Sequence, residues 1–419
     1  MITGKGLLAL ATAGVVMVPL GLSQAAPSSK LVSKSSAGVP ASAHSDVAQA
    51  TAISGDGRFV AFSSAAANLP GGNGSTQQVY VRDVKTGKTR LVSKNNDGDP
   101  AGSSVGDGAI SANGRYVGFS GTGAGLPGAT AHSQVWVHDR KRGKTILVSR
   151  AANGAPANLH ASSPSLSARG RAVSFESHAT NLPGGGLESR VFVRDLNRGK
   201  TILASRESAG DPAFGAVYGQ SISSDGRRVA FYSDDPELPG SGTHAYMRDL
   251  DRAKTFVADR NSAGAIGDDE GYNPSISGNG RFVIFESRAT NLPGAGASSN
   301  QVYVRDMKRK KTRLVGRTNS GDPQDGYAEF AHLSGSGRYA QFVSSAMNLA
   351  GAGQTQVYVR DLRRRKTKLV SRAANGDPAD QAAQNGSISQ DGRWTVFESS
   401  ADNLGGNTAL QQVFRAGGN

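Results

Sequence analysis

The sequence predicts an all-β fold, a seven-bladed β-propeller of four-stranded antiparallel blades. The first observation is a marker, Ile/Leu-Ser-x-x-Gly-Arg, which occurs seven times at intervals of 54 to 57 residues. The second is that each repeat of about 56 residues contains four short stretches with the period of two that is typical of strands. The third is that the chain starts with a fourth-strand pattern and ends with a third-strand pattern. Four strands repeated seven times fit a propeller.

The strands follow one another in the same order in every repeat. The first strand ends at the marker, where five repeats have Asp-Gly or Asn-Gly, which predicts a two-residue type I′ hairpin. The second strand reads RFVAFSS (58–64) and the third reads QVYVRD (78–83), both with β-branched and aromatic residues. A short turn then leads to the fourth strand, TRLVS (89–93). No window of comparable length has a helical period.

The two ends of the chain predict how the ring closes. The stretch KLVSK (30–34) resembles a fourth strand without a preceding repeat, and QVFRAGGN (412–419) resembles a third strand without a following one. We expect the N-terminal strand to complete the last blade, because this pairing removes an open sheet edge.

The first 25 residues have the features of a secretory signal peptide. Lys5 precedes an apolar, Gly-interrupted stretch (6–22), and small residues follow at 23–25. We therefore predict a signal peptide over 1–25, one propeller domain over 26–419 and an exported protein, extracellular or envelope-associated (periplasmic in a Gram-negative cell). No later stretch is long enough to span a membrane. The chain has no cysteine, which excludes disulfides, thiol nucleophiles and Cys-based metal sites.

The chain is basic, with 47 Lys and Arg against 33 Asp and Glu and a net charge of +14. A basic exported protein is attracted to anionic partners such as envelope polymers, lipid head groups or nucleic acid. A solvated, Arg-rich surface is the alternative.

The repeats resemble those of a known family. SISGDGRFVAFSS, ISSDGRRVAFYS and ISQDGRWTVFESS, followed by NLPG or NLGG and then by QVYVRD, are similar to the WD-repeat-like units of TolB-like β-propellers. The resemblance covers residues 30–419 and implies an exported binding platform. Some propellers of this kind are regulatory domains of hydrolases, but this chain lacks both a hydrolase domain and the N-terminal α/β domain of the namesake periplasmic protein.

Most repeated polar residues have structural explanations. The Asp that ends the third strand and the Asn that precedes Leu in the next loop are expected to cap turns; they are Asp83, Asp139, Asp195, Asp249, Asp306 and Asp361, and Asn68, Asn181, Asn291, Asn348 and Asn403. Glu176, Glu286 and Glu398 follow the Phe of the second strand, and we expect them to pair with Arg between blades rather than to face the channel.

Function is expected where the repeats differ, on the face that carries the long connections. The connections into blades five and six, SAGAIGDDEGYNPS (262–275) and SGDPQDGYAEFAH (320–332), concentrate acidic and aromatic residues. The candidate ligand-binding residues are Asp268, Asp269, Glu270, Tyr272, Asp325, Tyr327, Glu329 and Phe330, with Asp380 from the next connection. Tyrosines suit sugars and peptides, and carboxylates suit Ca²⁺, which makes Ca²⁺ the one metal to consider. Sequence drift in loops is the alternative.

The opposite face carries a candidate basic rim. It consists of Lys308, Arg309, Lys310, Lys311, Arg363, Arg364, Arg365 and Lys366, in the turns before two neighbouring fourth strands. Such a rim can hold an anionic surface polymer. Aromatic residues make up 6% of the chain and none lie among these turns, which disfavours nucleic acid.

These features favour a non-enzymatic, monomeric binding or scaffold module that needs no cofactor. Its partner, a protein or an envelope glycan, would be bound by the loop face. No HExxH, GxSxG or Walker motif occurs, and the seven His are scattered, with His160 and His332 expected on the loop face. The alternative is a carbohydrate-active enzyme, a hydrolase or lyase, with carboxylates at the mouth of the propeller.

Overall fold

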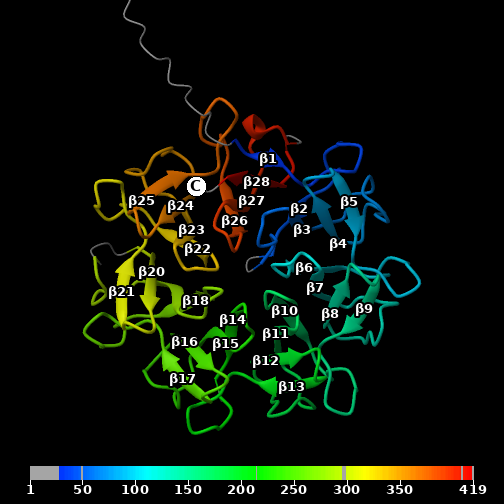
Figure 1. Ribbon diagram of the computed structural model, residues 1–419, viewed down its shortest axis with the longest axis horizontal. Helices are drawn as coiled ribbons and strands as arrows, with labels where there is room; N and C mark the ends of the chain where they lie inside the picture. Colours follow the sequence, from blue (N-terminus) through cyan, green and yellow to red (C-terminus); the bar gives the residue numbers. More distant parts are fainter. Residues whose placement is uncertain (1–27, 49–50, 214, 295–298, 407–408, 418–419) are drawn as a thin grey trace, which may run out of the picture.

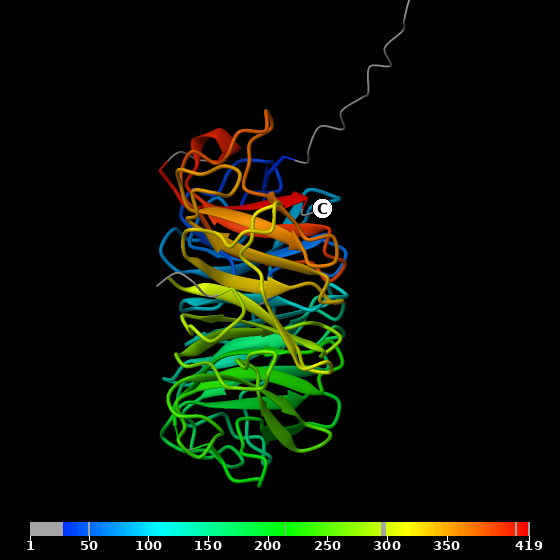
Figure 2. The same ribbon diagram turned by 90° about the vertical axis from the view of Figure 1, so that its left-hand side faces the viewer.

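The computed structural model describes residues 28–48, 51–213, 215–294, 299–406 and 409–417, which form seven four-stranded antiparallel sheets around a central axis (Figure 1). Seen on edge, the molecule is a flat disc (Figure 2). The predicted seven-bladed propeller is therefore confirmed. The predicted signal peptide lies outside the described residues, and no helix within them has the length and apolarity to cross a membrane.

In blades 1 to 6 the strands follow one another from the axis outwards in chain order, and in blade 7 the outermost strand comes from the N-terminal part of the chain. The innermost strands are β2 (Ser45–Asp46), β6 (Val105–Ile110), β10 (Ala161–Leu166), β14 (Val217–Ile222), β18 (Gly271–Ile276), β22 (Ala328–Leu333) and β26 (Ala383–Ile388). The second strands are β3 (Phe59–Ser64), β7 (Tyr116–Gly121), β11 (Ala172–Ser177), β15 (Arg228–Ser233), β19 (Phe282–Ser287), β23 (Tyr339–Ser344) and β27 (Trp394–Ser399).

The outer half of each blade is equally regular. The third strands are β4 (Gln78–Asp83), β8 (Gln134–Asp139), β12 (Arg190–Asp195), β16 (His244–Asp249), β20 (Gln301–Asp306), β24 (Gln356–Asp361) and β28 (Gln412–Gly417). The outermost strands are β5 (Lys88–Leu91), β9 (Lys144–Leu147), β13 (Lys200–Leu203), β17 (Lys254–Val257), β21 (Lys311–Leu314), β25 (Lys366–Leu369) and β1 (Lys30–Leu31). One 3₁₀ helix, η1 (Asp402–Leu404), lies in the last long loop.

The N-terminal strand closes the ring as predicted. β1 pairs with β28, with Lys30 opposite Arg415 and Leu31 opposite Phe414. Just beyond the paired residues, Ser33 donates its hydroxyl to Gln412 Oε1 at 2.6 Å and accepts the Val413 amide at 2.9 Å. The seventh blade thus combines strands from the two ends of the described chain and has four strands like the other six.

Each blade repeats one set of internal contacts. Opposed aromatic rings of the second and third strands stack at 5.5 to 5.9 Å; the pairs are Phe62–Tyr80, Phe119–Trp136, Phe175–Phe192, Phe231–Tyr246, Phe285–Tyr303, Phe342–Tyr358 and Phe397–Phe414. These rings are buried in cores formed where neighbouring blades pack together. The marker Arg has a cross-strand role as well, since Arg58 pairs with Asp83 at 2.7 Å and Arg338 with Asp361 at 2.6 Å.

The hairpin after the first strand differs from the prediction. In blade 1 a bond from the Gly57 amide to the Ser54 carbonyl closes the turn at 2.9 Å, and Gly57 has a φ of 74° whereas Asp56 has no positive φ. Asp56 instead accepts the Ser54 hydroxyl at 2.7 Å and the Arg58 amide at 3.0 Å. A type I′ turn would need positive φ at both residues, so the Asp is selected for its hydrogen bonds.

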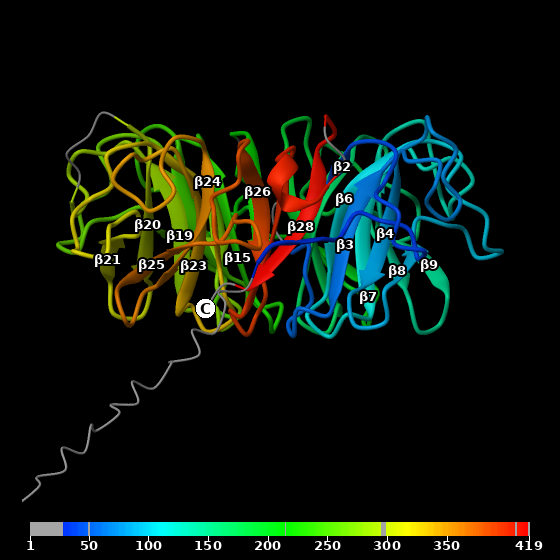
Figure 3. The ribbon, with the colours of Figure 1, turned by 90° about the horizontal axis from the view of Figure 1, so that it is seen from above.

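The two faces of the disc differ (Figure 3). The loop face carries the connections from second to third strands and the ends of those that enter the next blade, and the hairpin face carries the short turns. The connections between blades also cover the outer wall, because each one starts with a small hairpin closed by an isolated bridge, such as Arg317 to Pro323. This hairpin contacts the outer strands of the next blade, where Thr367 donates its amide to Asn319 Oδ1 at 2.7 Å.

On the hairpin face, the blades are joined around the axis. Seven backbone hydrogen bonds of 2.8 to 3.1 Å link each blade to the next; the donor and acceptor residues are Gly55–Ala112, Asn113–Ala168, Ala168–Ser224, Ser224–Gly278, Asn279–Gly335, Gly335–Gln390 and Asp391–Gly55. Gln390 Nε2 also crosses from blade 7 to Ser224 Oγ in blade 4 at 2.6 Å, which obstructs this end of the channel. The loop-face end of the channel is therefore the end that this bond leaves open.

Candidate functional site

The central channel is lined by the innermost strands and narrows towards the hairpin face. Apolar side chains of all seven blades form a collar around a cavity of about 60 Å³; they are Ile53, Ile110, Leu166, Ile222, Ile276, Leu333 and Ile388. This space is too small for a sugar or a peptide. Any larger ligand must therefore be bound nearer the loop face, at the mouth of the channel.

A β-bulge shapes the mouth in blades 2 to 7. The register between first and second strands shifts after the second residue of the first strand. The third residue has a φ between 47° and 61° in all six blades; these residues are Asp107, Ser163, Gly219, Asn273, Phe330 and Asn385. The equivalent segment of blade 1 includes residues 49–50, which are outside the described residues. The bulges turn the second and third residues of each strand to the mouth.

Phe330 is unusual at this position. A bulky side chain rarely has a positive φ, and small or polar residues hold the other five bulges. Its side chain is partly buried and packs on the core between blades 6 and 7. Strain of this kind costs of order 1–3 kcal/mol and tends to occur at binding sites.

Three blades place a glutamate at the seam with the next blade. Glu176 accepts the Gly219 amide at 2.8 Å, and Glu286 accepts the Phe330 amide at 2.7 Å. Glu398 accepts the Val47 amide at 2.6 Å. Burial raises the pKa of each of the three carboxyls to about 7.

The expected pairing of these glutamates with Arg is wrong. Within the described residues, their partners are the backbone amides of the next bulge and nearby amide side chains, with Asn300 and Asn273 donating to Glu286 Oε2 at 3.1 and 3.3 Å. A carboxylate fits here because the left-handed bulge turns an amide away from the sheet ladder. The glutamates thus fasten one blade to the next.

Aromatic side chains gather along one arc of the mouth, in blades 4 to 6. Tyr218 and Tyr232 are opposed across β14 and β15 with ring centroids 5.8 Å apart, and Tyr218 is 41% exposed. In blade 5, half-buried Tyr272 lies opposite Glu286. Burial raises the pKa of Tyr272, and the charges of Glu286, Glu270 and Glu329 contribute to the rise. The arc therefore combines aromatic faces with carboxylates, as a sugar or peptide site requires.

The structure divides the predicted ligand-binding residues into two groups. Tyr272, Glu329 and Phe330 lie at the mouth, on the innermost strands of blades 5 and 6. Asp269 and Glu270 are exposed just before β18, and half-buried Tyr327 bonds through its hydroxyl to Thr355 Oγ1 at 2.9 Å.

The second group, Asp268, Asp325 and Asp380, occupies one equivalent position of the repeat. Asp268 accepts the Thr290 amide at 2.6 Å, Asp325 accepts the Met347 amide at 2.7 Å, and Asp380 accepts the Asp402 amide at 3.0 Å. Each of these carboxylates thereby holds the next long loop by a backbone amide, and we call this arrangement the loop clasp.

The repeated Asn completes this clasp from the other side. Asn291 donates to the Ile266 carbonyl at 2.8 Å and accepts the Asp268 amide at 3.3 Å. Its predicted capping role is thus observed. The described residues contain no group of three or more His, Asp or Glu arranged to hold a metal ion.

Two histidines were expected on the loop face. His160 Nδ1 accepts the Ser133 amide there at 3.2 Å. His332 instead lies on β22, with both ring nitrogens buried and without a hydrogen-bond partner in the described part of the chain. Burial lowers the pKa of His332 to about 4, so its ring is neutral at pH 7.

The eight residues of the predicted basic rim are all exposed, on the turns and strand starts of blades 5 and 6. The carboxylates of Asp306 and Asp361 order these turns, for example by accepting the Lys308 amide at 3.1 Å and the Arg363 amide at 2.9 Å. The rim lies at the hairpin face, away from the mouth.

Comparisons with known proteins show the fold. No protein-family model matches the chain, and no curated protein matches it. Among solved structures, the β-propeller domain of the Trilobed protease from Pyrococcus furiosus has a TM-score of 0.55 at 12% identity, over 89% of this chain and 95% of that domain. That domain is described as having an open velcro topology, whereas here β1 closes the ring with β28.

Two further structures are similar to this chain at low sequence identity. A prolyl endopeptidase has a TM-score of 0.51 at 16% identity, and 86% of this chain covers 45% of it. TolB from Acinetobacter baumannii has a TM-score of 0.41 at 13% identity, over 86% of this chain and 80% of that one. At these identities the likeness to the propeller domain and to the prolyl endopeptidase shows the fold alone.

Proposed function

We propose that the protein is an exported, monomeric binding module of the TolB-like type. It holds a protein segment or an envelope glycan at the mouth of its channel, against the arc of blades 4 to 6. The observation that carries this proposal is the gathering of Tyr218, Tyr232, Tyr272 and Phe330 on neighbouring blades, one of them in a strained backbone conformation. The obstructed far end of the channel supports recognition from the loop face.

The acidic residues have a supporting role in this proposal. Asp269, Glu270 and Glu329 remain available to a ligand, whereas Asp268, Asp325 and Asp380 direct their carboxylates to loop amides. In this proposal the exposed carboxylates would bind Ca²⁺ beside the glycan or protein ligand. The test compares binding of that ligand in the presence of Ca²⁺ with its binding in EDTA.

The test is a binding panel of envelope glycans and proteins at low and high salt. The variant Tyr218→Ala/Tyr272→Ala removes two rings of the arc. Gln384→Ala is the matched control, since Gln384 is exposed at the same strand position in blade 7. We expect salt-resistant binding that falls at least tenfold in the double variant and persists in the control. Binding that ignores the tyrosines would contradict the proposal.

The alternative function is that of a carbohydrate-active enzyme. The raised pKa values of Glu286 and Glu329 make these two carboxyls the pair to test. Burial raises the pKa of Glu286 and of Glu329, and the two charges interact. Catalysis needs two carboxyls about 5–10 Å apart, one of them protonated. Glu329→Gln should abolish glycan cleavage in an enzyme, and it should alter affinity alone in a binding module.

A further inference from the structure

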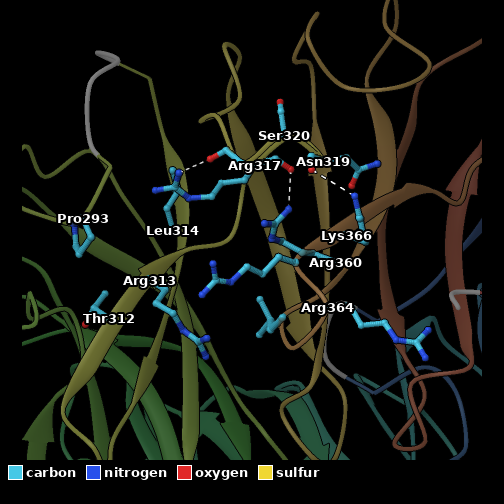
Figure 4. Close-up of a pocket in the computed structure, with 13 residues that line it drawn as sticks. Pro293, Thr312, Arg313, Leu314, Arg317, Asn319, Ser320, Arg360, Arg364 and Lys366 are labelled. Atoms are coloured by element: carbon cyan, nitrogen blue, oxygen red, sulfur yellow. Dashed lines mark hydrogen bonds between the residues drawn. The ribbon is translucent and has the colours of Figure 1, made fainter.

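A groove in the outer wall between blades 5 and 6 has a strongly basic lining. It has a volume of about 440 Å³ and lies between β21, the hairpin after it, and β24 and β25 of the next blade (Figure 4). We call it the basic groove, after its cationic lining residues Arg313, Arg317, Arg360, Arg364, Arg365 and Lys366. No carboxylate lines it.

The charges in the basic groove are not neutralised by the protein. None of the six cationic residues forms an ion pair within the described residues. The nearby carboxylate of Asp361 is already occupied, because it pairs with Arg338 at 2.6 Å and accepts the Arg364 amide at 3.0 Å.

One of the five guanidinium groups is buried. Arg360 is 4% exposed and donates to the Arg317 carbonyl at 2.9 Å (Figure 4). It also donates to Thr367 Oγ1 at 2.6 Å, and the two bonds fix its position. Burial lowers the pKa of Arg360 to about 10, and the charges of Arg317, Arg365 and Arg313 lower it further. A bound anion would relieve this repulsion.

The turn that carries Arg365 also differs between the blades. Arg365 has a φ of 59°, in the left-handed region, where blades 1 to 3 have Gly87, Gly143 and Gly199 and blades 4 and 5 have Ala253 and Lys310. An arginine is strained in this conformation and a glycine is not. Blades 4 to 6 thus accept a residue other than glycine at this position, and in the two blades that form the groove this residue is a cation.

An equivalent groove elsewhere in the ring has fewer cations, although Arg82, Arg194, Arg248 and Arg305 hold the position of Arg360 in four other blades. Between blades 1 and 2 a groove of about 450 Å³ has His138 in place of Arg360 and Gly143 in place of Arg365. Burial lowers the pKa of His138 to about 4, so it is neutral at pH 7. This groove keeps Arg90, Lys94 and Arg140 as its cations.

We propose that the basic groove binds the phosphate groups of an anionic polymer. A guanidinium group can form two parallel hydrogen bonds to the oxygens of one phosphate. Positive charge continues along the exposed residues Lys308–Lys311, so a chain of several phosphates gains more contacts than a single phosphate group does. Pro, Thr, Leu, Asn, Ser and Gly supply the rest of the lining, without an aromatic ring for base stacking, which favours a polymer other than a nucleic acid. This site is separate from the mouth and does not depend on its function.

The test measures affinity of the purified protein for long-chain polyphosphate at 50 and 300 mM NaCl. Polyglutamate, heparin and a single-stranded oligonucleotide represent carboxylate, sulfate and nucleic-acid chains. Arg313→Ser/Arg364→Ser removes two charges from the basic groove, and Arg90→Ser/Arg142→Ser removes two from equivalent positions of blades 1 and 2. Arg365→Gly removes a charge at a position where glycine fits the backbone.

We expect polyphosphate to bind at least tenfold tighter than the other three polymers. Affinity should fall at least tenfold in Arg313→Ser/Arg364→Ser, less than twofold in the matched control, and several-fold in Arg365→Gly without a lower Tm. Equal losses in the two double variants would mean that net charge alone binds the polymer. That result, an unchanged affinity of Arg365→Gly, or equal affinity for any comparison polymer would overturn the proposal.

Discussion

At the scale of single residues, blade 4 replaces a pair that other blades share. In four blades the Ser after the fourth strand donates its hydroxyl to a Gln of the third strand at 2.5 to 2.7 Å; the pairs are Ser33–Gln412, Ser93–Gln78, Ser149–Gln134 and Ser371–Gln356. In blade 4 the same positions hold Asp259 and His244, which form a buried ion pair of 2.6 Å. Both positions of blade 4 thus differ from those of the four other blades, and the two residues still satisfy each other's hydrogen-bonding groups, as buried polar partners must.

This replacement predicts the outcome of a swap. His244→Gln leaves the carboxylate of Asp259 buried without a cation and should destabilise the protein by about 2–4 kcal/mol. The double variant His244→Gln/Asp259→Ser recreates the common pair and should recover most of the loss. Thermal unfolding measures both. A double variant as unstable as the single one would show that the pair is not interchangeable.

At the scale of elements, the loop clasp separates structural from ligand-binding acids. Asn158 holds the position of Asp268 in blade 3 and makes equivalent contacts, accepting the Thr180 amide at 2.9 Å and donating to Thr180 Oγ1 at 2.7 Å. Asp268→Asn should therefore leave Tm nearly unchanged, whereas Asp268→Ala should cost about 1 kcal/mol.

Binding measurements complete this prediction. If Asp268 acts only in the clasp, Asp268→Asn keeps full affinity for any ligand of the loop face, whereas a loss of affinity at unchanged Tm would identify its charge as part of the site.

The elements also show how far sequence reasoning extends. Strand order, blade number and closure could be predicted because period two and the seven-fold marker repeat them many times. The role of Asp268 could not, since nothing in the sequence indicates that its connection lies against Thr290 and Asn291 of the following loop, whose amides it accepts. Tyr218 and Tyr232 were missed because a tyrosine inside a strand resembles an ordinary core residue. A change of residue type at one repeat position, here Tyr232 where three blades have Glu, is the signal that could have found them.

At the scale of the whole molecule, stability should depend on pH through the inter-blade glutamates. The pKa of Glu176, Glu286 and Glu398 is raised to about 7 by burial, so folding favours their protonated form. Their contribution is complete below the unfolded pKa and is lost as pH rises through 7.

We therefore expect a higher Tm at pH 6 than at pH 8. The free energy of unfolding should be larger at pH 6 by roughly 1 kcal/mol for each carboxyl. Buried His138 and His332, with pKa values of about 4, oppose this trend below pH 6.5, where they charge in the unfolded chain. A triple Glu→Gln variant should have a flatter profile between pH 6 and 8. A wild-type Tm that rises with pH in this range would refute the assignment.

The seam between β1 and β28 has a consequence for chain connectivity. In its register, Gly417 and Ser28 correspond to Asp83 and Lys88 of blade 1, which a four-residue turn connects. Joining Gly417 to Ser28 through a turn of that length should turn the seam into an ordinary hairpin, and the backbone could then be cut in the turn of any other blade. Such a circular permutant should fold to the same ring, because the order of blades around the axis would be unchanged while the position of the chain ends moves.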